Sequence, residues 1–175
     1  VEGLAPARTL LRTGSASVRM AILTLVGTGG DVMRPLVPDV ELLLATEQEA
    51  GLRTMAARTL GQVGPAAQGS VPALLAAAKE KDATLHATAI EAVGLIDAEQ
   101  AYDELLAIAF GAHAPGENRQ APAIIALGHA RSKADALVPK LLELHGKEGI
   151  EWTARESIPL ALANLGKGAV PRLRV

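Results

Sequence analysis

A pair of residues, valine or leucine followed by glycine, recurs at nearly constant spacing along the chain. The glycines lie 34, 33, 34 and 38 residues apart, at Gly27, Gly61, Gly94, Gly128 and Gly166. A period of this length is typical of proteins built from stacked supersecondary units, in which one unit cannot bury its apolar face alone. This repeat constrains the fold more than any other feature, and it predicts a serial array of similar units.

Two further markers keep the same phase as the glycines. A proline that follows a valine stands eleven residues after three of the glycines, at Pro38, Pro72 and Pro139. Upstream, eight residues before the glycines or nine in the last case, stand Arg19, Arg53, His86 and Arg119. Independent markers in one phase are hard to obtain by chance. We therefore interpret each period as one structural unit.

Each repeat has the pattern of two helices. In the first segment, 52–60, the apolar residues lie three and four positions apart, which is one face of a helix. We expect the glycine to end this helix in a left-handed C-cap, Ser70 to cap the second helix, and Pro72 to lie in its first turn. The apolar residues are nearly all Ala, Leu, Val and Ile, with one Trp, one Tyr and one Phe, and this composition favours helices over strands.

The markers divide the chain into repeats with interrupted ends. The expected boundaries are 1–17 (partial), 18–51, 52–84, 85–117, 118–152 and 153–175 (partial), with a further second helix beginning at Val170-Pro171. We therefore expect one repeat domain, which is a fragment of a longer array. The 38-residue period carries an insert at 146–152, and Pro159 in the following first helix predicts a kink or a late helix start.

With these motifs in place, the chain resembles the HEAT-repeat family, and within it the bacterial HEAT-like repeats of the phycobilisome-lyase type. The pattern is carried most completely by residues 53–75, and the resemblance extends from Val18 to Leu173. It implies an all-α fold, a right-handed α-α superhelix of about five helical hairpins whose second helices line a concave face. It also implies that Arg19, Arg53 and Arg119 bond acidic residues or helix-end carbonyls of the adjacent repeat. We favour this role over an anion-binding stripe.

The scaffold implied by the resemblance predicts a function in binding. We expect a non-catalytic scaffold that holds a protein or peptide on the concave face. The predicted partner-binding residues are outward positions of second helices and two aromatic residues: Asp39, Ala73, Tyr102, Glu104, Lys140, Glu143 and Trp152. Phe110 is expected in the core. The alternative is a HEAT-like lyase, or the regulatory or targeting appendage of an enzyme whose catalytic domain lies outside this chain.

Charge and composition argue against several other functions. The net charge is -2 and aromatic residues are few, so the chain lacks the basic, aromatic surface that nucleic acid binding needs. No apolar run is long enough to span a membrane. His113, His129 and His145 lie 16 residues apart without metal-ligand spacing, and no nucleophile arrangement occurs. We therefore predict no enzyme activity, cofactor, metal or membrane insertion. We expect a bacterial cytoplasmic protein, although the absence of cysteine also suits a secreted or periplasmic one.

Overall fold

The computed structural model describes residues 2–113 and 118–166, and every regular element among them is a helix. These residues fall into two compact units divided between Ile96 and Asp97. The prediction of an all-α chain is therefore confirmed for the described residues. The second helix expected at Val170-Pro171 lies outside them.

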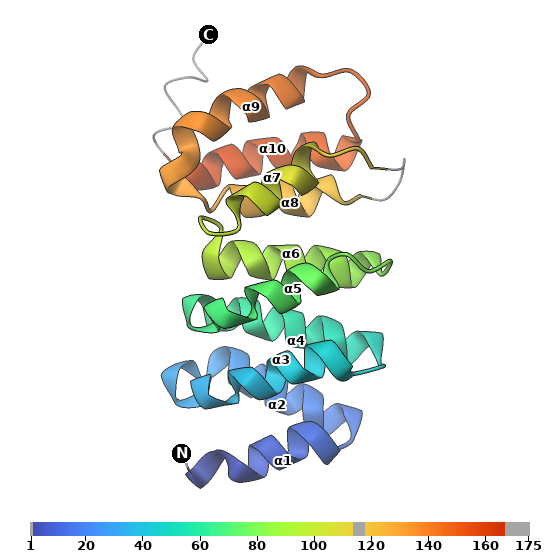
Figure 1. Ribbon diagram of the computed structural model, residues 1–175, viewed down its shortest axis with the longest axis vertical. Helices are drawn as coiled ribbons and strands as arrows, with labels where there is room; N and C mark the ends of the chain where they lie inside the picture. The colour runs from blue at the N-terminus through green and yellow to red at the C-terminus, as the bar shows by residue number, and fades with distance from the viewer. Residues whose placement is uncertain (1, 114–117, 167–175) are drawn as a thin grey trace. The chain divides into compact units, whose positions relative to one another are not determined.

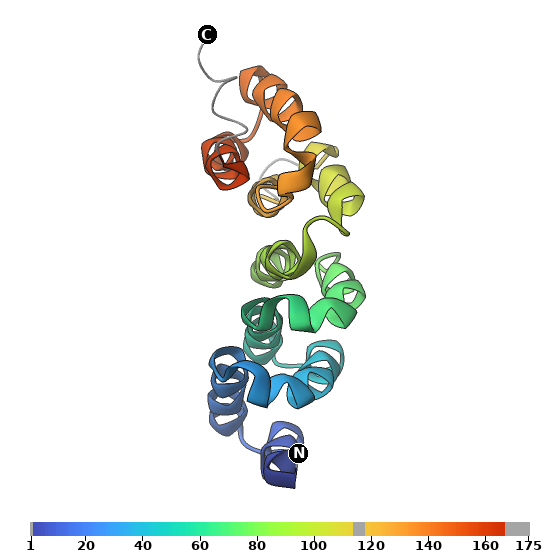
Figure 2. The same cartoon turned by 90° about the vertical axis from the view of Figure 1, so that its left-hand side faces the viewer.

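The N-terminal unit packs its helices in chain order. Its elements are the 3-10 helix η1 (Glu2–Leu4), α1 (Ala5–Thr13), α2 (Ala16–Thr28), η2 (Gly30–Leu36), α3 (Val37–Thr46), α4 (Ala50–Val63), η3 (Gly64–Ser70), α5 (Val71–Ala77) and α6 (Ala83–Asp97). Within this unit α2, α4 and α6 form one layer, which we call the first-helix layer (Figure 1). The second-helix layer consists of α1, α3 and α5 (Figure 2). The helix α4 packs on both α2 and α3, so each new hairpin covers the one before it.

The C-terminal unit repeats this arrangement. Its elements are α7 (Tyr102–Phe110), α8 (Gln120–Leu127), the 3-10 helix η4 (Arg131–Lys133), α9 (Ala134–Gly146) and α10 (Trp152–Leu165). The first-helix layer here is α8 and α10, which pack on each other, while α7 packs on α8 and α9 on α10. Leucine and isoleucine side chains such as Leu105, Ile124 and Leu137 are fully buried between the layers. Burying each such side chain contributes roughly 1.5–3 kcal/mol.

Polar side chains near the start of the first-layer helices bond the carboxyl end of the preceding second-layer helix. In the N-terminal unit, Arg19 Nε donates to the carbonyl of Gly14 at 2.9 Å and His86 Nδ1 donates to that of Ala78 at 2.5 Å. The last carbonyls of a helix have no partner within it, so these bonds satisfy groups that would otherwise need water. We call Arg19, Arg53, His86, Gln120 and Arg155 the capping side chains.

Arg53 makes both a hydrogen bond to the preceding helix end and an ion pair with an acidic residue. Its Nε donates to the carbonyl of Leu44 at 2.9 Å, and its two terminal nitrogens donate to the Glu80 carboxylate at 2.7 and 2.5 Å. Arg19 makes the corresponding ion pair with Glu47. The expected bonds of Arg19 and Arg53 to the adjacent repeat are therefore confirmed for the helix-end carbonyls, whereas the acidic partners lie in the same repeats as the two arginines.

Two of the capping side chains were not predicted. In the C-terminal unit, Gln120 Nε2 donates to the carbonyls of Ala109 and Gly111 at 3.1 and 3.4 Å. Arg155 donates to the carbonyl of Lys147 at 3.0 Å. Gln120 lies eight residues before Gly128, as Arg19 lies before Gly27, so the spacing that led to Arg119 was one residue out of register.

The repeated glycines mostly do not end helices, and that prediction is wrong for three of them. Gly27, Gly61 and Gly94 lie inside α2, α4 and α6. A Cβ atom at Gly61 would lie 2.9 Å from the Cα of Ala92 on α6. The helices α4 and α6 approach so closely that a side chain at position 61 has no room, and this approach is the physical reason for Gly61.

Gly128 follows the end of α8 in a right-handed conformation, and a Cβ there would lie 2.8 Å from the Cα of Ala161 on α10. Only Gly166 behaves as expected: it ends α10 with a φ of +83°, a conformation that costs glycine little.

The predicted positions of two prolines are confirmed, whereas the predictions for Pro139, for the helix start at Pro159 and for Ser70 are wrong. Pro38 and Pro72 lie in the first turns of α3 and α5, as predicted, because a missing N–H costs nothing there. Pro139 instead lies inside α9, which begins five residues earlier, directly after η4. The late start predicted at Pro159 is wrong, since α10 begins at Trp152 and continues through this proline. Ser70 makes no cap bond; its buried hydroxyl donates to Glu41 at 2.7 Å.

Candidate functional site

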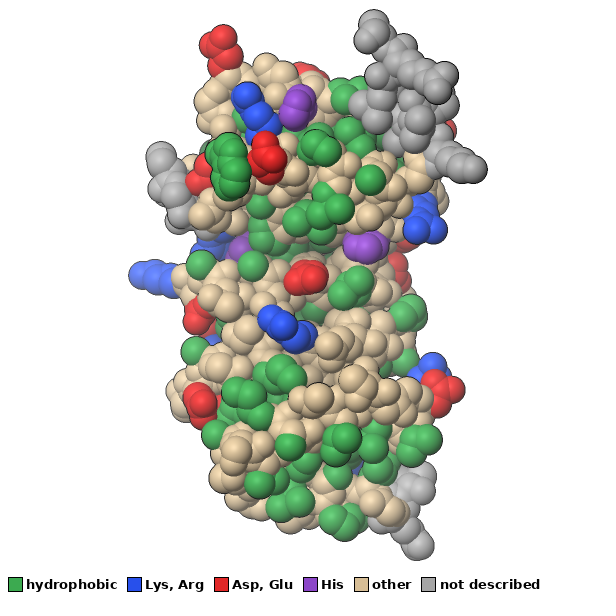
Figure 3. All heavy atoms as spheres, turned by 180° about the vertical axis from the view of Figure 1, so that it is seen from behind, with side chains coloured by type: hydrophobic (Ala, Val, Ile, Leu, Met, Phe, Trp, Pro, Cys, Tyr) green, Lys and Arg blue, Asp and Glu red, His purple; other side chains and the backbone are tan. Residues whose placement is uncertain are grey.

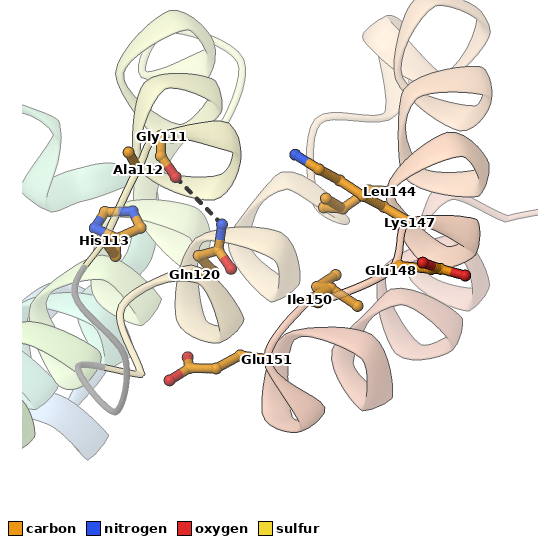
Figure 4. Close-up of a pocket in the computed structure, with 10 residues that line it drawn as sticks. Gly111, Ala112, His113, Gln120, Leu144, Lys147, Glu148, Ile150 and Glu151 are labelled. Atoms are coloured by element: carbon orange, nitrogen blue, oxygen red, sulfur yellow. Dashed lines mark hydrogen bonds between the residues drawn. The ribbon is translucent and has the colours of Figure 1, made fainter.

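A cleft opens in the C-terminal unit between the end of α7, the start of α8 and the second half of α9. Its larger part has a volume of about 630 Å³ and is lined by Phe110, Gly111, Gln120, Lys140, Leu142, Glu143, Leu144, Gly146 and Lys147. A smaller part of about 350 Å³, drawn in Figure 4, shares Gly111, Gln120, Leu144 and Lys147 with it. The two hollows are therefore neighbours, and we call them together the cleft.

The link between α9 and α10 forms one wall of the cleft. This link contains the insert that lengthens the fourth period, and its residues Glu148, Gly149, Ile150 and Glu151 line the smaller part. The φ of Gly149 is +78°, which allows the chain to turn sharply before α10. The irregular period in the sequence therefore corresponds to the place where this unit is hollowed.

The opposite wall is fixed by hydrogen bonds to the end of α7. Gln120 holds two carbonyls there, and Figure 4 shows its bond to Gly111 across the wall. His113 Nε2 donates to the carbonyl of Ile108 at 2.6 Å. A carbonyl only accepts, so the Nε2 atom of His113 carries a proton. Both side chains are engaged in holding the wall, which gives the cleft a preformed shape.

The cleft is lined by both apolar and oppositely charged groups. Phe110 is 38% exposed at its edge, and Ile150 faces the side of Gln120 (Figure 4). The Lys147 amine extends toward Gly111, whereas the Glu148 carboxylate points away and that of Glu151 points toward the opposite wall. Such a lining offers apolar contact together with nearby charges of both signs. The mixed charges differ from the single sign of charge that a polyanion site would need.

Two of the predicted partner-binding residues, Lys140 and Glu143, lie in this cleft and are exposed. Trp152 is the first residue of α10, directly after Glu151, and is 73% exposed. Glu104 is exposed on α7 but does not line the cleft. Ala73 is half-buried on α5 in the N-terminal unit.

The outward position predicted for Asp39 is wrong. The residue is only 7% exposed, because its carboxylate is held between two arginines of α1. Arg8 Nε and Arg12 Nη2 each donate to one of its oxygens at 2.7 Å. A buried carboxylate with two charged donors is a structural tie between α1 and α3.

Tyr102 is half-buried at the start of α7, and its hydroxyl is buried without a hydrogen-bond partner among the described residues. Burial raises the pKa of Tyr102 above its usual value, and the neighbouring Asp103 carboxylate adds to this. The Lys133 amine lies 5.8 Å from the ring centre, within cation–π range. One face of the Tyr102 ring is therefore already engaged by a cation of its own unit.

Several residues that line the cleft were not predicted from the sequence. Phe110 was predicted in the core, but it lies at the last position of α7, where the helix ends beside the cleft. The sequence did contain a signal for Gln120, because this residue lies eight positions before Gly128, the same offset as Arg19 before Gly27. For Lys147 and Glu151 the sequence held no signal beyond their place in the insert.

No group of three or more His, Asp or Glu side chains in residues 2–113 and 118–166 is arranged to hold a metal ion. Among the same residues, no helix combines the length and the apolar character needed to cross a membrane. No protein-family model matches the chain, and no curated protein is similar to it in sequence.

Proposed function

We propose that the chain is a HEAT-like right-handed solenoid that binds a protein or peptide on its second-helix layer and catalyses no reaction. The repeated bond from each capping side chain to the preceding helix end supports serial stacking. Arg19, Arg53 and His86 make it in the N-terminal unit, and Gln120 and Arg155 make it in the C-terminal unit. The same local contact, made at each successive hairpin, is what a one-dimensional array requires.

The binding role rests on one observation, the cleft beside α7 and α9. Hydrogen bonds from side chains to main-chain carbonyls hold its walls, so a ligand need not pay to order them. It is also lined by an exposed aromatic ring and by charges of both signs, the features that give interfaces an anchor and an orientation. An extended segment of another protein matches this combination of contacts.

The second-helix layer of the N-terminal unit offers further apolar anchor points. Leu10 on α1 is 43% exposed and Leu42 on α3 is 48% exposed. Each stands four residues after a proline, as does the exposed Ala76 on α5. Corresponding positions on successive helices thus form a row, and an extended partner can contact such a row through side chains at regular intervals.

The proposal is tested by crosslinking at the cleft followed by measurement of affinity. A photoreactive phenylalanine analogue replaces Phe110 in the full-length protein, and the same analogue replaces Leu160, which is 49% exposed on α10, as a control. A partner that crosslinks only from position 110 is then purified. Its affinity is measured for the wild type and for the double charge swap Lys140→Glu/Glu143→Lys.

The control for affinity is a matched charge swap in the first-helix layer, Arg58→Glu/Glu91→Lys, which also preserves net charge. We expect the cleft swap to weaken binding by about tenfold or more, because it reverses the local field that orients the partner. All four residues are exposed, so both variants should change stability by less than about 0.5 kcal/mol. Equal loss of affinity in the two variants would contradict binding at the cleft.

A further inference from the structure

The second-layer helices of the C-terminal unit, α7 and α9, do not pack on each other as those of the N-terminal unit do. In the N-terminal unit, α1 packs on α3 and α3 packs on α5. The helices α7 and α9 make no comparable contact, and each packs instead on the first-layer helix that follows it. The space between them is the larger part of the cleft, with a volume of about 630 Å³. A contact that the N-terminal unit makes internally is therefore open here to a segment of another molecule.

The walls of this space carry apolar side chains from both helices. Phe110, the last residue of α7, is 38% exposed. Leu142 on α9 is half-buried, and the nearly buried Leu144 lines both parts of the cleft. An aromatic ring and two leucines around one hollow favour a bulky apolar side chain, because its entry removes apolar surface of both molecules from water.

Two lysines lie beside these apolar side chains. Lys140 and Lys147 both line the larger part of the cleft, and Glu143 is the one carboxylate among its lining residues. The carboxylates of the link, Glu148 and Glu151, line only the smaller part. Neither lysine amine forms a hydrogen bond or an ion pair within the part of the chain that the structure describes. On the first-helix layer, by contrast, Lys and Arg side chains are scattered among other types (Figure 3). The larger part of the cleft thus combines apolar walls with an excess of positive charge.

The main chain of Lys147 is held on both sides. Its N–H donates to the carbonyl of Leu144 at 3.1 Å, and its carbonyl accepts a hydrogen bond from Arg155 at 3.0 Å. Its amine extends toward Gly111 at the end of α7 (Figure 4). Side chains of that wall already bond the carbonyls at this helix end. The Lys147 amine is therefore aimed across the cleft, where it can donate to an acceptor that enters.

We propose that the larger part of the cleft recognises a short peptide segment in which an acidic side chain stands close to a bulky apolar one. This inference rests on the proposed function, because it names the chemistry of the segment bound at the same cleft. The apolar side chain contacts Phe110 and Leu142. The carboxylate pairs with the amines of Lys140 and Lys147, and a basic segment is rejected because it would place like charges together. Since Glu143 opposes the two lysines, the site favours one acidic residue over a run of them.

A library of random dodecapeptides displayed on phage tests this proposal, with the full chain as bait. Peptides that bind the wild type but not Phe110→Ser are cleft binders. We expect these peptides to share an Asp or Glu within about three positions of a Leu, Ile, Met or Phe, because an extended chain covers roughly 10 Å in three residues. Circular dichroism should show the wild-type helix content in Phe110→Ser, because the ring lies at the end of its helix and is partly exposed.

Fluorescence anisotropy of one enriched peptide then compares the wild type with Lys147→Glu and Lys79→Glu. Lys79 is an exposed lysine of the N-terminal unit, so its replacement changes the net charge equally and leaves the cleft intact. We expect Lys147→Glu to weaken binding by about tenfold or more and Lys79→Glu by less than about twofold, because distant charges are screened. Replacing the acidic residue of the peptide by lysine should reverse the order, so that this peptide binds Lys147→Glu more tightly than the wild type.

The outcomes separate this inference from the function on which it rests. Cleft-binding peptides that share no acidic residue overturn the inference and leave the proposed function intact. The same holds for peptides that bind Lys147→Glu as tightly as the wild type. A library that yields no cleft-binding peptide contradicts both the inference and the proposed function.

Discussion

Replacing Gly61 by alanine tests whether close approach between α4 and α6 is the reason for the repeated glycine. Alanine has the higher helix propensity by about 1 kcal/mol, so propensity alone predicts a more stable protein. The added Cβ would lie 2.9 Å from the Cα and 3.0 Å from the Cβ of Ala92. Since one of these atoms is backbone, α6 must move, and overpacking of this kind costs about 1–3 kcal/mol. The net effect should be a loss of about 1 kcal/mol.

Gly51→Ala on the same helix is the matched control. A Cβ at Gly51 has its nearest neighbours at 3.8 and 3.9 Å, which is ordinary contact, so only the gain in propensity should appear. The two variants should differ by about 2 kcal/mol, and for a chain of this size thermal unfolding followed by circular dichroism should separate their melting temperatures by about 4–8 °C. A Gly61→Ala protein that melts as high as Gly51→Ala would refute the role assigned to Gly61.

Two further predictions concern buried and paired carboxylates. Asp39→Ala should lower the free energy of unfolding by about 1–3 kcal/mol in urea titrations, because two charged donors lose their acceptor; an equal loss in Asp31→Ala, whose carboxylate is 81% exposed, would contradict this. Hydrogen bonds from Arg53 hold the pKa of Glu80 below its ordinary value of 4.5. The ionised carboxylate therefore stabilises the folded chain above pH 4.5, and this stability is lost as the pH falls through the lowered pKa. The difference in melting temperature between the wild type and Glu80→Gln should therefore be present at neutral pH and shrink below pH 4.5, and a difference that grows on acidification would count against the pairing.

The helices and their order could be predicted from the sequence because they depend on local patterns. Apolar residues three and four apart, rich in Ala and Leu, specify a helix without reference to the rest of the chain. The bonds of Arg19 and Arg53 to helix ends were expected only from the resemblance to HEAT-like repeats, although the recurring position of the two arginines was visible in the sequence. Pro38 and Pro72 were placed correctly for a similar local reason.

The remaining features depend on neighbours that the sequence does not identify. Gly61 has the same local setting whether it ends a helix or lies under α6, and only the packing of α6 distinguishes the two. The helical pattern alone predicts an outward position for Asp39, but Arg8 and Arg12 of α1 cover it. Phe110 has the hydrophobicity of a core residue, yet it lies where α7 ends at the cleft. The insert at 146–152 was visible as an irregularity, but its role as a wall of the cleft required the fold.

Small-angle X-ray scattering tests the central claim, serial stacking of two-helix repeats, most directly. A compact globular domain of 175 residues has a radius of gyration of about 16 Å. The solenoid that we propose predicts a value clearly above this for the monomeric chain, with the asymmetric distance distribution of an elongated particle. A radius of gyration of about 16 Å with a symmetric distribution would contradict the solenoid and the extended binding surface that depends on it.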